Sequence, residues 1–540
     1  MEFTTKKTTT LPYSYHTFLL AFRFDCEFNE FADLGNWQTD SLRQPGDTAE
    51  LLMNYQTYQY FTPEARRLMF NEGRIKRYKY HIPDSAERLF AIRKTLATEE
   101  TDEATGKKLR KTEEYRLTID NIRITVFHNH IAIMQFELEN HDPNHQTLDS
   151  VKRINEYGRR INLPYIVRGD AIHTLVADSV SILGNEASFS CFGEKALKEF
   201  GGSTDNQNII PPIMNLIREL LPESDEKTEI APVIDDRMFV CCLVRDHAFS
   251  EKVMSLRKDN TDPIPVIGKD IYADRELSNE IYSFAYIDAD DSSCQSPEMR
   301  EALLKRCIYS RWRDLGTIDV ITHHSFVRIT GSSKGIIASV INPFLTEYVI
   351  MAAGVLLQRA TLMKLSKECA DISADYFAKD NPKINDEALN DRIRKLKRDY
   401  VYAQNNIFLN QFTAQEQGID EFDMLRNELY IKDSLKSLSY KVNGIYDFIT
   451  ENAEDEENSL LNALTVFGLP LSLIQTLAVI ISFTYIGEDS AQKLPLEWLL
   501  FGIVLACSII ISVIGIKQYK RRNTRKGKRK KKNNIRKTPP

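Results

Sequence analysis

The sequence predicts an α/β or α+β domain, followed by a long helical stalk and two C-terminal membrane-spanning helices. Three observations support this fold class. Short runs of apolar and β-branched residues alternate with helical segments over residues 1–343. Helical periodicity takes over from Leu345. Near the C-terminus, two apolar segments each meet the roughly 20-residue requirement for a helix that crosses hydrocarbon.

The element pattern divides the 540 residues into regions of different character. We expect an α/β domain at 1–343, a helical packing region at 344–417, a stalk helix at 418–459, two spans at 460–486 and 494–516, and a basic tail at 517–540.

Within the α/β domain, the clearest sheet signal is a hairpin over 121–138 that turns at Asn129-His130. Other strands are expected at 17–24, 237–244, 281–287 and 325–330. Helices are expected at 147–160, 297–312 and from about Asn208 to Leu221, with helical or mixed segments at 50–60 and 63–70. The charged segment 99–114 predicts a hairpin or loop.

The stalk begins after a break at Gly418-Ile419-Asp420, where Asp420 can serve as N-cap. Its apolar residues recur mostly at steps of three and four, which predicts one long helix with a coiled-coil-like stripe. They are Phe422, Leu425, Leu429, Leu435, Leu438, Val442, Ile445 and Ile449. A single helix has nothing to bury this stripe against, so partner helices are expected.

Charge sets the predicted orientation. The tail after Lys517 is rich in Lys and Arg and contains no acid, whereas the whole chain has a formal charge of −6. Such a cluster marks the cytoplasmic side of a membrane. We therefore expect a multi-pass protein of the inner (cytoplasmic) membrane with both termini in the cytoplasm. The acidic body argues against direct nucleic-acid binding.

The first span carries a stripe of polar side chains at helical spacing, namely Asn458, Asn462, Thr465, Ser472 and Thr476. Such a stripe either lines a pore or provides hydrogen bonds between packed helices, and the sequence is compatible with both interpretations. The connector between the spans holds Glu488 and Asp489, which would form an acidic outer ring.

This architecture, with Pro470 inside the first span, resembles the CorA-type divalent-cation channels, which are homopentamers whose first spans line the pore. The family carries Tyr-Gly-Met-Asn at the outer end of that span. This chain has Tyr485-Ile486-Gly487-Glu488-Asp489 instead, so the selectivity motif is absent. The resemblance implies a homo-oligomer in a lipid bilayer, with a divalent cation as a candidate ligand.

Candidate binding residues gather in two stretches of the α/β domain. Arg159 and Arg160 end a predicted helix, where an open pair of guanidinium groups can hold a phosphate or, alternatively, stabilise the helix C-terminus. Asp235, Asp236 and Arg237 open a buried strand, either at the lip of a pocket or in a solvated turn.

Trp312, with its neighbouring arginines, and His323 and Ser325 in Thr322-His323-His324-Ser325 combine groups that suit a nucleotide. The alternative is a surface Arg/Trp pair and an edge strand. The histidine-rich run at 128–145 matches no closed metal-ligand set, so any metal site is unknown. No catalytic constellation is present, and we expect no enzyme.

Three short motifs are similar to a narrower group, the CorA-like membrane effectors associated with type III CRISPR systems. They are Asn155 to Ile161, Asp235 to Phe239 and Thr322 to Val327. The resemblance implies a ligand-gated channel or membrane-perturbing effector in antiviral defence. Its activating second messenger would be the conjugate of S-adenosylmethionine and AMP, a small nucleotide-like ligand.

In that reading, Arg159 and Arg160 would take the phosphate, Asp235 or Asp236 a cationic group, and Trp312 a base. No cofactor is certain. Two alternatives remain: a constitutive divalent-cation transporter that lacks Gly-Met-Asn, and a structural membrane anchor with a globular domain.

Overall fold

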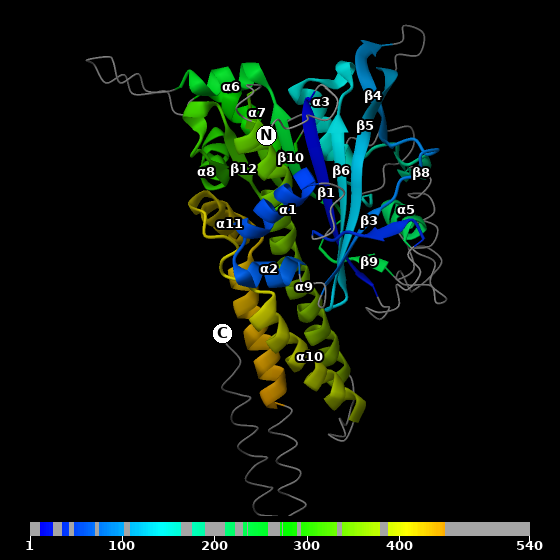
Figure 1. Cartoon of the computed structure of the whole chain (residues 1–540), viewed down its shortest axis with the longest axis vertical. Helices are drawn as coiled ribbons and strands as arrows, with labels where there is room; N and C mark the ends of the chain where they lie inside the picture. The colour runs from blue at the N-terminus through cyan, green and yellow to red at the C-terminus, as the bar shows by residue number, and fades with distance from the viewer. Residues whose placement is uncertain are drawn as a thin grey trace, which may run out of the picture. The chain divides into compact units, whose positions relative to one another are not determined.

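The computed structural model describes residues 11–24, 35–42, 48–70, 75–101, 108–163, 175–189, 211–221, 230–234, 236–256, 271–272, 274–288, 293–331, 337–377 and 387–448. A large β-sheet organises this part of the chain (Figure 1). Its strands are β1 (Ser14–Phe24), β2 (Trp37–Thr39), β3 (Ile75–Tyr80), β4 (Leu89–Thr101), β5 (Lys108–Phe127), β6 (Ile131–Asn140), β7 (Ser179–Ile182), β8 (Asn185–Ser188), β9 (Ile230–Pro232), β10 (Phe239–Arg245), β11 (Ile308–Tyr309), β12 (Ile318–Ile321) and β13 (Ser325–Thr330).

The strand order is β11-β12-β13-β10-β1-β6-β5-β4-β7-β8, with β3 joining β2 to β5 and β9 pairing with β1. In the described ranges, β10 and β13 are the parallel pair and the other strand pairs are antiparallel. The sheet is therefore mixed, and helices follow the strands as the α/β or α+β class predicts. The hairpin expected at 121–138 is confirmed, with His130 at φ 59° in its turn.

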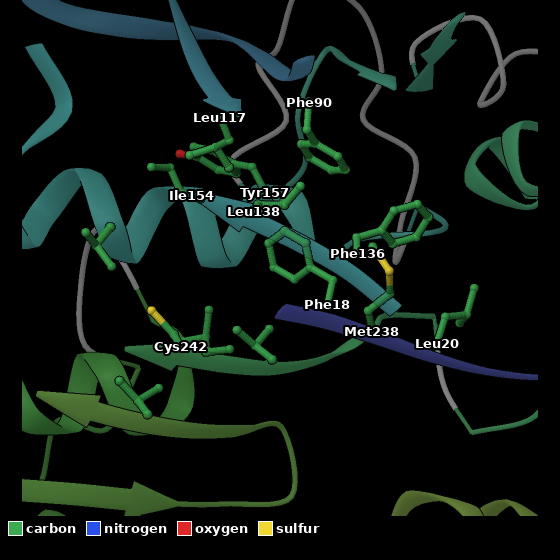
Figure 2. Packing of buried hydrophobic residues seen from close by; sticks show 14 of the residues in the cluster. Phe18, Leu20, Phe90, Leu117, Phe136, Leu138, Ile154, Tyr157, Met238 and Cys242 are labelled. Carbon is green, nitrogen blue, oxygen red and sulfur yellow. The ribbon is translucent and has the colours of Figure 1, made fainter. Parts of the chain in front are cut away.

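Strand β1 lies in the middle of the sheet and is buried on both faces. Phe18, Leu20 and Phe22 point into the main core, where Phe18 lies beside Ile154 and Tyr157 of the helix α3 (Leu148–Gly158) (Figure 2). The alternate residues Leu19 and Ala21 are also nearly inaccessible. The sequence of a strand that is buried on both faces is a nearly continuous run of apolar residues. Such a run is why the sequence predicts a strand at 17–24.

The α-helices of the described ranges are α1 (Thr48–Tyr60), α2 (Pro63–Phe70), α3 (Leu148–Gly158), α5 (Pro212–Leu220), α6 (His247–Met254), α7 (Arg275–Tyr286), α8 (Pro297–Cys307), α9 (Val349–Phe377), α10 (Glu387–Asn406) and α11 (Glu416–Glu428). Thr147 caps α3 by accepting a hydrogen bond from Ser150 N at 3.2 Å, so this helix starts where predicted. Short 3₁₀ turns lie at Pro143–His145 and Arg313–Leu315, and π-helical turns at Ile337–Ile341 and Phe344–Tyr348.

The strand expected at 281–287 is wrong, because these residues belong to α7. Asp274 caps this helix through a 3.0 Å hydrogen bond from Leu277 N. Buried Leu277, Ile281 and Ala285 then follow at helical steps. The apolar and aromatic window resembles a strand only because it begins in the middle of the helix.

The helix expected at 297–312 is too long. α8 ends at Cys307, and the chain continues into the short strand β11 and a turn around Trp312. The next residue after α8, Ile308, adopts an extended conformation and pairs with Val320. Sheet pairing therefore overrides the helical pattern here.

Nearly all of helix α9 lies within the one stretch of the described residues, Ser339–Tyr376, that is long and apolar enough to cross a membrane by length and composition. In that stretch, 61% of the most apolar window is buried inside the protein. Its side chains pack on neighbouring elements; Thr361, for instance, accepts a hydrogen bond from Asn129 at 2.9 Å. This burial is typical of a core helix.

The stalk is not one continuous helix. α11 begins at Glu416 with Gln415 as N-cap, so the expected cap at Asp420 is wrong. The helix ends at Glu428, Tyr430 adopts φ 54°, and a second helical segment covers residues 431–448. A left-handed residue interrupts the helical hydrogen-bond ladder, and the apolar stripe alone does not reveal it.

The chain divides into two compact units. One contains the residues up to Ala374 together with Arg392–Val442, and the other contains the remaining described residues. The sheet and the sites discussed below belong to the first unit. The two predicted spans, the pore stripe, Glu488, Asp489 and the basic tail lie outside the described residues.

Candidate functional site

Three segments that are far apart in the sequence meet at the C-terminal end of α3. Arg159 O accepts a hydrogen bond from Met238 N at 2.7 Å. His324 O accepts one from Val240 N at 3.1 Å. The end of α3, the start of β10 and the β12–β13 turn are thus held together by backbone hydrogen bonds. These segments carry the three motifs singled out in the sequence.

Asp236 lies between two arginines of this cluster. Arg160 Nη1 donates to Asp236 Oδ2 at 3.0 Å, and Arg237 Nε donates to Asp236 Oδ1 at 3.0 Å. Arg160 and Arg237 also form an isolated antiparallel bridge through their backbones. One carboxylate therefore serves two guanidinium groups, each of which has more than one donor.

Arg159 is the most buried cation of the cluster, with 2% of its surface exposed. Its Nη2 donates to Ile287 O, at the C-terminal cap of α7, over a long 3.4 Å. Its Nε and Nη1 are buried and have no hydrogen-bond partner within the described ranges. A cation at a helix C-terminus is favourable, but two unpaired N–H groups are costly to bury.

The β12–β13 turn places two histidine rings beside these arginines. The rings of His323 and His324 lie 3.8 Å apart, and His323 contacts Tyr286 edge-on at 6.4 Å. The Nδ1 atom of His323 is buried without a hydrogen-bond partner in the part of the chain that is described. The turn thus adds an aromatic surface and a further unsatisfied polar atom.

Electrostatics makes this cluster positive. Burial and then the neighbouring arginines lower the pKa of His324 to about 2, and the same causes lower the pKa of His323. Burial, then Arg160 and Arg237, lower the pKa of Arg159 to about 9, so it stays charged at neutral pH. The arrangement can therefore bind an anion, whose charge would relieve this repulsion.

A cavity of about 30 Å³ lies beside the cluster, large enough for roughly one water molecule. Arg237, His323 and His324 line it, together with Leu356 of α9 and Leu429 at the end of α11. The open arginine pocket that the sequence suggested is thus wrong for the described residues, since Arg160 is also only 5% exposed. A ligand larger than water reaches these groups only if one of the neighbours moves.

The structure brings together Arg159, Arg160, Asp236, Arg237 and His323. Asp235 lies outside the described residues. Ser325 is fully buried, and its hydroxyl donates to Ala285 O at 2.7 Å, as does Thr322 Oγ1 at 2.8 Å, which anchors the turn on α7.

Trp312 lies at the opposite end of β12 from the histidines and is 37% exposed. Arg311, which lies over its ring, forms ion pairs with Glu416 at 2.9 Å and Asp420 at 3.4 Å on α11. The whole of β12 separates the tryptophan from the turn, so the predicted combination of Trp312 with His323 in one site is wrong.

Sequence reasoning missed His324, Tyr286 and Ile287. His324 lies inside the motif Thr322 to Val327, and its position in the turn between two strands could have indicated that it belongs to the site. Tyr286 and Ile287 were hidden because their segment was assigned to a strand. At the end of the helix, Ile287 presents its carbonyl group to Arg159, and Tyr286 presents its ring to His323.

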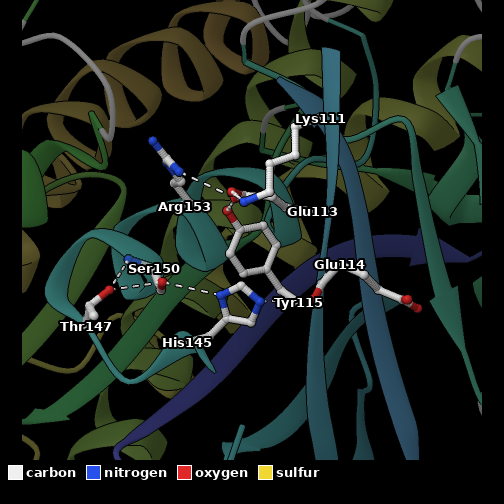
Figure 3. Close-up of polar contacts among 8 residues, drawn as sticks. All are labelled: Lys111, Glu113, Glu114, Tyr115, His145, Thr147, Ser150 and Arg153. Atoms are coloured by element: carbon white, nitrogen blue, oxygen red, sulfur yellow. Dashed lines mark hydrogen bonds and ion pairs between the residues drawn. The ribbon is translucent and has the colours of Figure 1, made fainter. Parts of the chain in front are cut away.

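Within the described residues, His145 of the histidine-rich run makes structural contacts. His145 Nε2 donates to Glu114 O at 3.1 Å and its ring lies 4.5 Å from that of Tyr115 (Figure 3). Tyr115 in turn donates to Glu113 at 2.7 Å, and Glu113 pairs with Arg153 of α3 at 3.4 Å. The described residues contain no group of three or more His, Cys, Asp or Glu side chains that could hold a metal ion.

No protein-family model and no curated protein match the chain. Among solved structures, the chain is similar to the complete structure of the CorA magnesium transporter from Methanocaldococcus jannaschii, with 12% sequence identity, a TM-score of 0.20, and coverage of 54% of this chain and 94% of the transporter.

Proposed function

We propose that the chain is a ligand-gated membrane channel or membrane-perturbing effector of CorA type, and that its α/β unit binds a phosphate-bearing messenger. The observation that carries this proposal is the buried cationic cluster. Arg159, Arg160 and Arg237 face the carboxylates of Asp236 and Glu156, which leaves an excess of positive charge. Arg159 also retains two unpaired donors among the described residues, and arginine is well suited to bidentate phosphate recognition.

The membrane part of the proposal rests on the sequence. The apolar segments 460–486 and 494–516 are followed by a basic tail, which favours two spans with both termini in the cytoplasm. The polar stripe through the first segment favours a pore over a plain anchor. The proposed assembly is a homopentamer in the inner membrane.

The proposed messenger is the S-adenosylmethionine–AMP conjugate, within type III CRISPR antiviral defence. Its phosphate would pair with Arg159 and Arg160, its cationic groups with Asp236, and an adenine would stack on His323 or Tyr286. This assignment rests on the three short motifs, which meet at the cluster, and on the chemistry of the groups there. Trp312 has no role in it.

The test is equilibrium binding of the conjugate to full-length protein in detergent. Arg159→Ala and Arg160→Ala should each weaken binding by roughly tenfold or more, because each removes a charge-assisted hydrogen bond of about 1.5–3 kcal/mol. Arg93→Ala is the matched control, since Arg93 is half-exposed and pairs with Glu186 at 3.5 Å. Its affinity should equal that of the wild type.

Because Arg159 and Arg160 are buried, each variant needs a folding control, for which thermal unfolding and oligomer size are measured in parallel. Arg159→Lys keeps the charge but loses the planar fork, and should bind with intermediate affinity. Wild-type affinity in a folded double alanine variant would exclude the arginine pair from the site. No binding by the wild type would exclude this messenger and favour the constitutive cation transporter.

A further inference from the structure

The β12–β13 hairpin lies between the cationic cluster and α11, the first helix of the stalk. Its turn carries His323 and His324. Further along the same hairpin, Asp319 and Arg328 lie directly opposite each other in the strand register. Both side chains are almost completely buried, at 1% and 2% exposure. The hairpin that carries the histidines of the cationic cluster therefore also places Asp319 and Arg328 inside the protein core.

Arg328 makes a two-pronged ion pair with Asp319 and reaches a third residue. Its Nε donates to Asp319 Oδ1 at 2.5 Å and its Nη2 to Asp319 Oδ2 at 2.8 Å. The same Nη2 donates to Glu421 Oε1 of α11 at 3.0 Å. The guanidinium also lies over the rings of Tyr348 and Phe344, at 4.8 and 5.2 Å. This packing fixes the direction in which Arg328 points.

Glu421 is fully buried, and it is the acid through which α11 contacts this pair. Burial, and then the nearby Asp319, raise the pKa of Glu421 well above its ordinary value. A protonated Glu421 leaves one positive and one negative charge in the triad, which is the neutral arrangement that a core tolerates. The link between hairpin and helix is thus a specific polar contact inside an apolar region.

The far end of α11 also meets the site. Leu429 lines the same small cavity as Arg237, His323 and His324. Two residues later, the second helical segment begins at residue 431. A ligand that displaces the β12–β13 turn therefore acts on α11 at two points, the cavity wall at Leu429 and the buried contact at Glu421.

We propose that the Asp319–Arg328–Glu421 triad transmits occupancy of the anion site to α11 and the helical segment that follows it. Arg328 and Glu421 are positioning residues in this scheme and make no contact with the ligand. The proposal rests on the proposed function, because it assigns the route by which ligand binding reaches the stalk.

The experiment compares two substitutions at one position in the full-length protein. Glu421→Gln keeps an acceptor for Arg328 and mimics the neutral acid. Glu421→Leu has similar volume, leaves the Arg328–Asp319 pair intact and removes the contact to α11. Amide hydrogen exchange is measured over the hairpin at 318–330 and over 416–442, with and without the S-adenosylmethionine–AMP conjugate.

In wild type and Glu421→Gln, the conjugate should change exchange protection in both regions, by roughly 5- to 150-fold over 416–442. In Glu421→Leu, affinity and the response of the hairpin should persist, while the response of 416–442 is lost. An unchanged response of 416–442 in Glu421→Leu would overturn the proposal.

A second arm separates this proposal from the identity of the messenger. Arg159→Ala perturbs the site without any ligand, and its effect on exchange over 416–442 is measured both in the otherwise wild-type chain and in combination with Glu421→Leu. We expect an effect only where Glu421 is present. Equal effects in both backgrounds would overturn the triad as the route, even if the conjugate binds; a difference would support the route even if the conjugate does not.

Discussion

His16 is a buried titratable residue whose protonation depends on whether the protein is folded. Its ring is inaccessible and lies between Ser14 Oγ at 2.9 Å and Asn155 Oδ1 at 2.7 Å. Burial lowers its pKa to about 4, although the hydrogen bond to Asn155 acts in the opposite direction. The folded protein therefore binds this proton less readily than the unfolded chain does.

This difference predicts a loss of stability on acidification. The contribution of His16 is fully present above the ordinary histidine pKa of about 6.5 and is lost as the pH falls towards 4, by about 3 kcal/mol. Urea unfolding at several pH values measures it. His16→Gln, which can keep both hydrogen bonds, should flatten the curve over this interval. An equally steep curve in that variant would assign the acid sensitivity to other groups, such as His324.

At the same scale, the residue types of the site were predictable but their burial was not. Helix-end arginines, an acid before a strand and a histidine turn all stood in short motifs. Their meeting depends on the bridge between Arg160 and Arg237, which joins residues 77 positions apart. No local sequence pattern predicts such a long-range contact, and none predicted that Arg159 would be buried.

Among the elements, helix α9 depends on a close approach at Gly354. A Cβ atom at this position would overlap the ring of Phe412, which is fully buried against Phe422 at 4.9 Å between ring centres. Gly354→Ala should therefore destabilise the protein by about 1–3 kcal/mol, as overpacking usually does. Chemical denaturation measures this loss.

Gly444→Ala is the matched control, because a Cβ atom there meets nothing within 4 Å, and stability should stay equal or rise slightly. In a Phe412→Leu background, the penalty of Gly354→Ala should shrink because the two sites share one contact. Additive penalties would refute the proposed overlap.

Local patterns predicted α3, most of β1 and the part of the β5–β6 hairpin next to its turn, 121–138, but not the first part of β5 from Lys108. The wrong predictions have two causes. Either the apolar stretch used for the prediction began in the middle of a helix or strand, or a tertiary contact ended that helix or strand. For α7, the cap at Asp274 lay upstream of the apolar window. For the stalk, the interruption at Tyr430 leaves the apolar steps of three and four intact, so periodicity cannot reveal it.

For the whole molecule, the proposed assembly predicts a pentamer. The stripe residues Phe422, Leu425 and Leu438 are already buried within one chain, so the expected pentamer rests on the proposed CorA-type architecture, which implies five subunits. Native mass spectrometry of detergent-solubilised full-length protein should give a species of five 62.2 kDa chains. A monomer over a wide concentration range would rule out the proposed assembly. Glu421→Leu should form the same oligomer, since the triad lies within one chain.

The central place of β1 has a consequence for synthesis. Among the described strands, β1 is synthesised before the others, yet it pairs with β6 on one side and with β10 on the other, the latter joining Ser14 to Val244. At roughly 5–20 residues per second, β1 waits about 10–50 s for its second neighbour. Until then it exposes an apolar edge to other nascent chains on the same message. Codon choice between positions 24 and 239 would therefore influence how much of the protein escapes aggregation while it is being made.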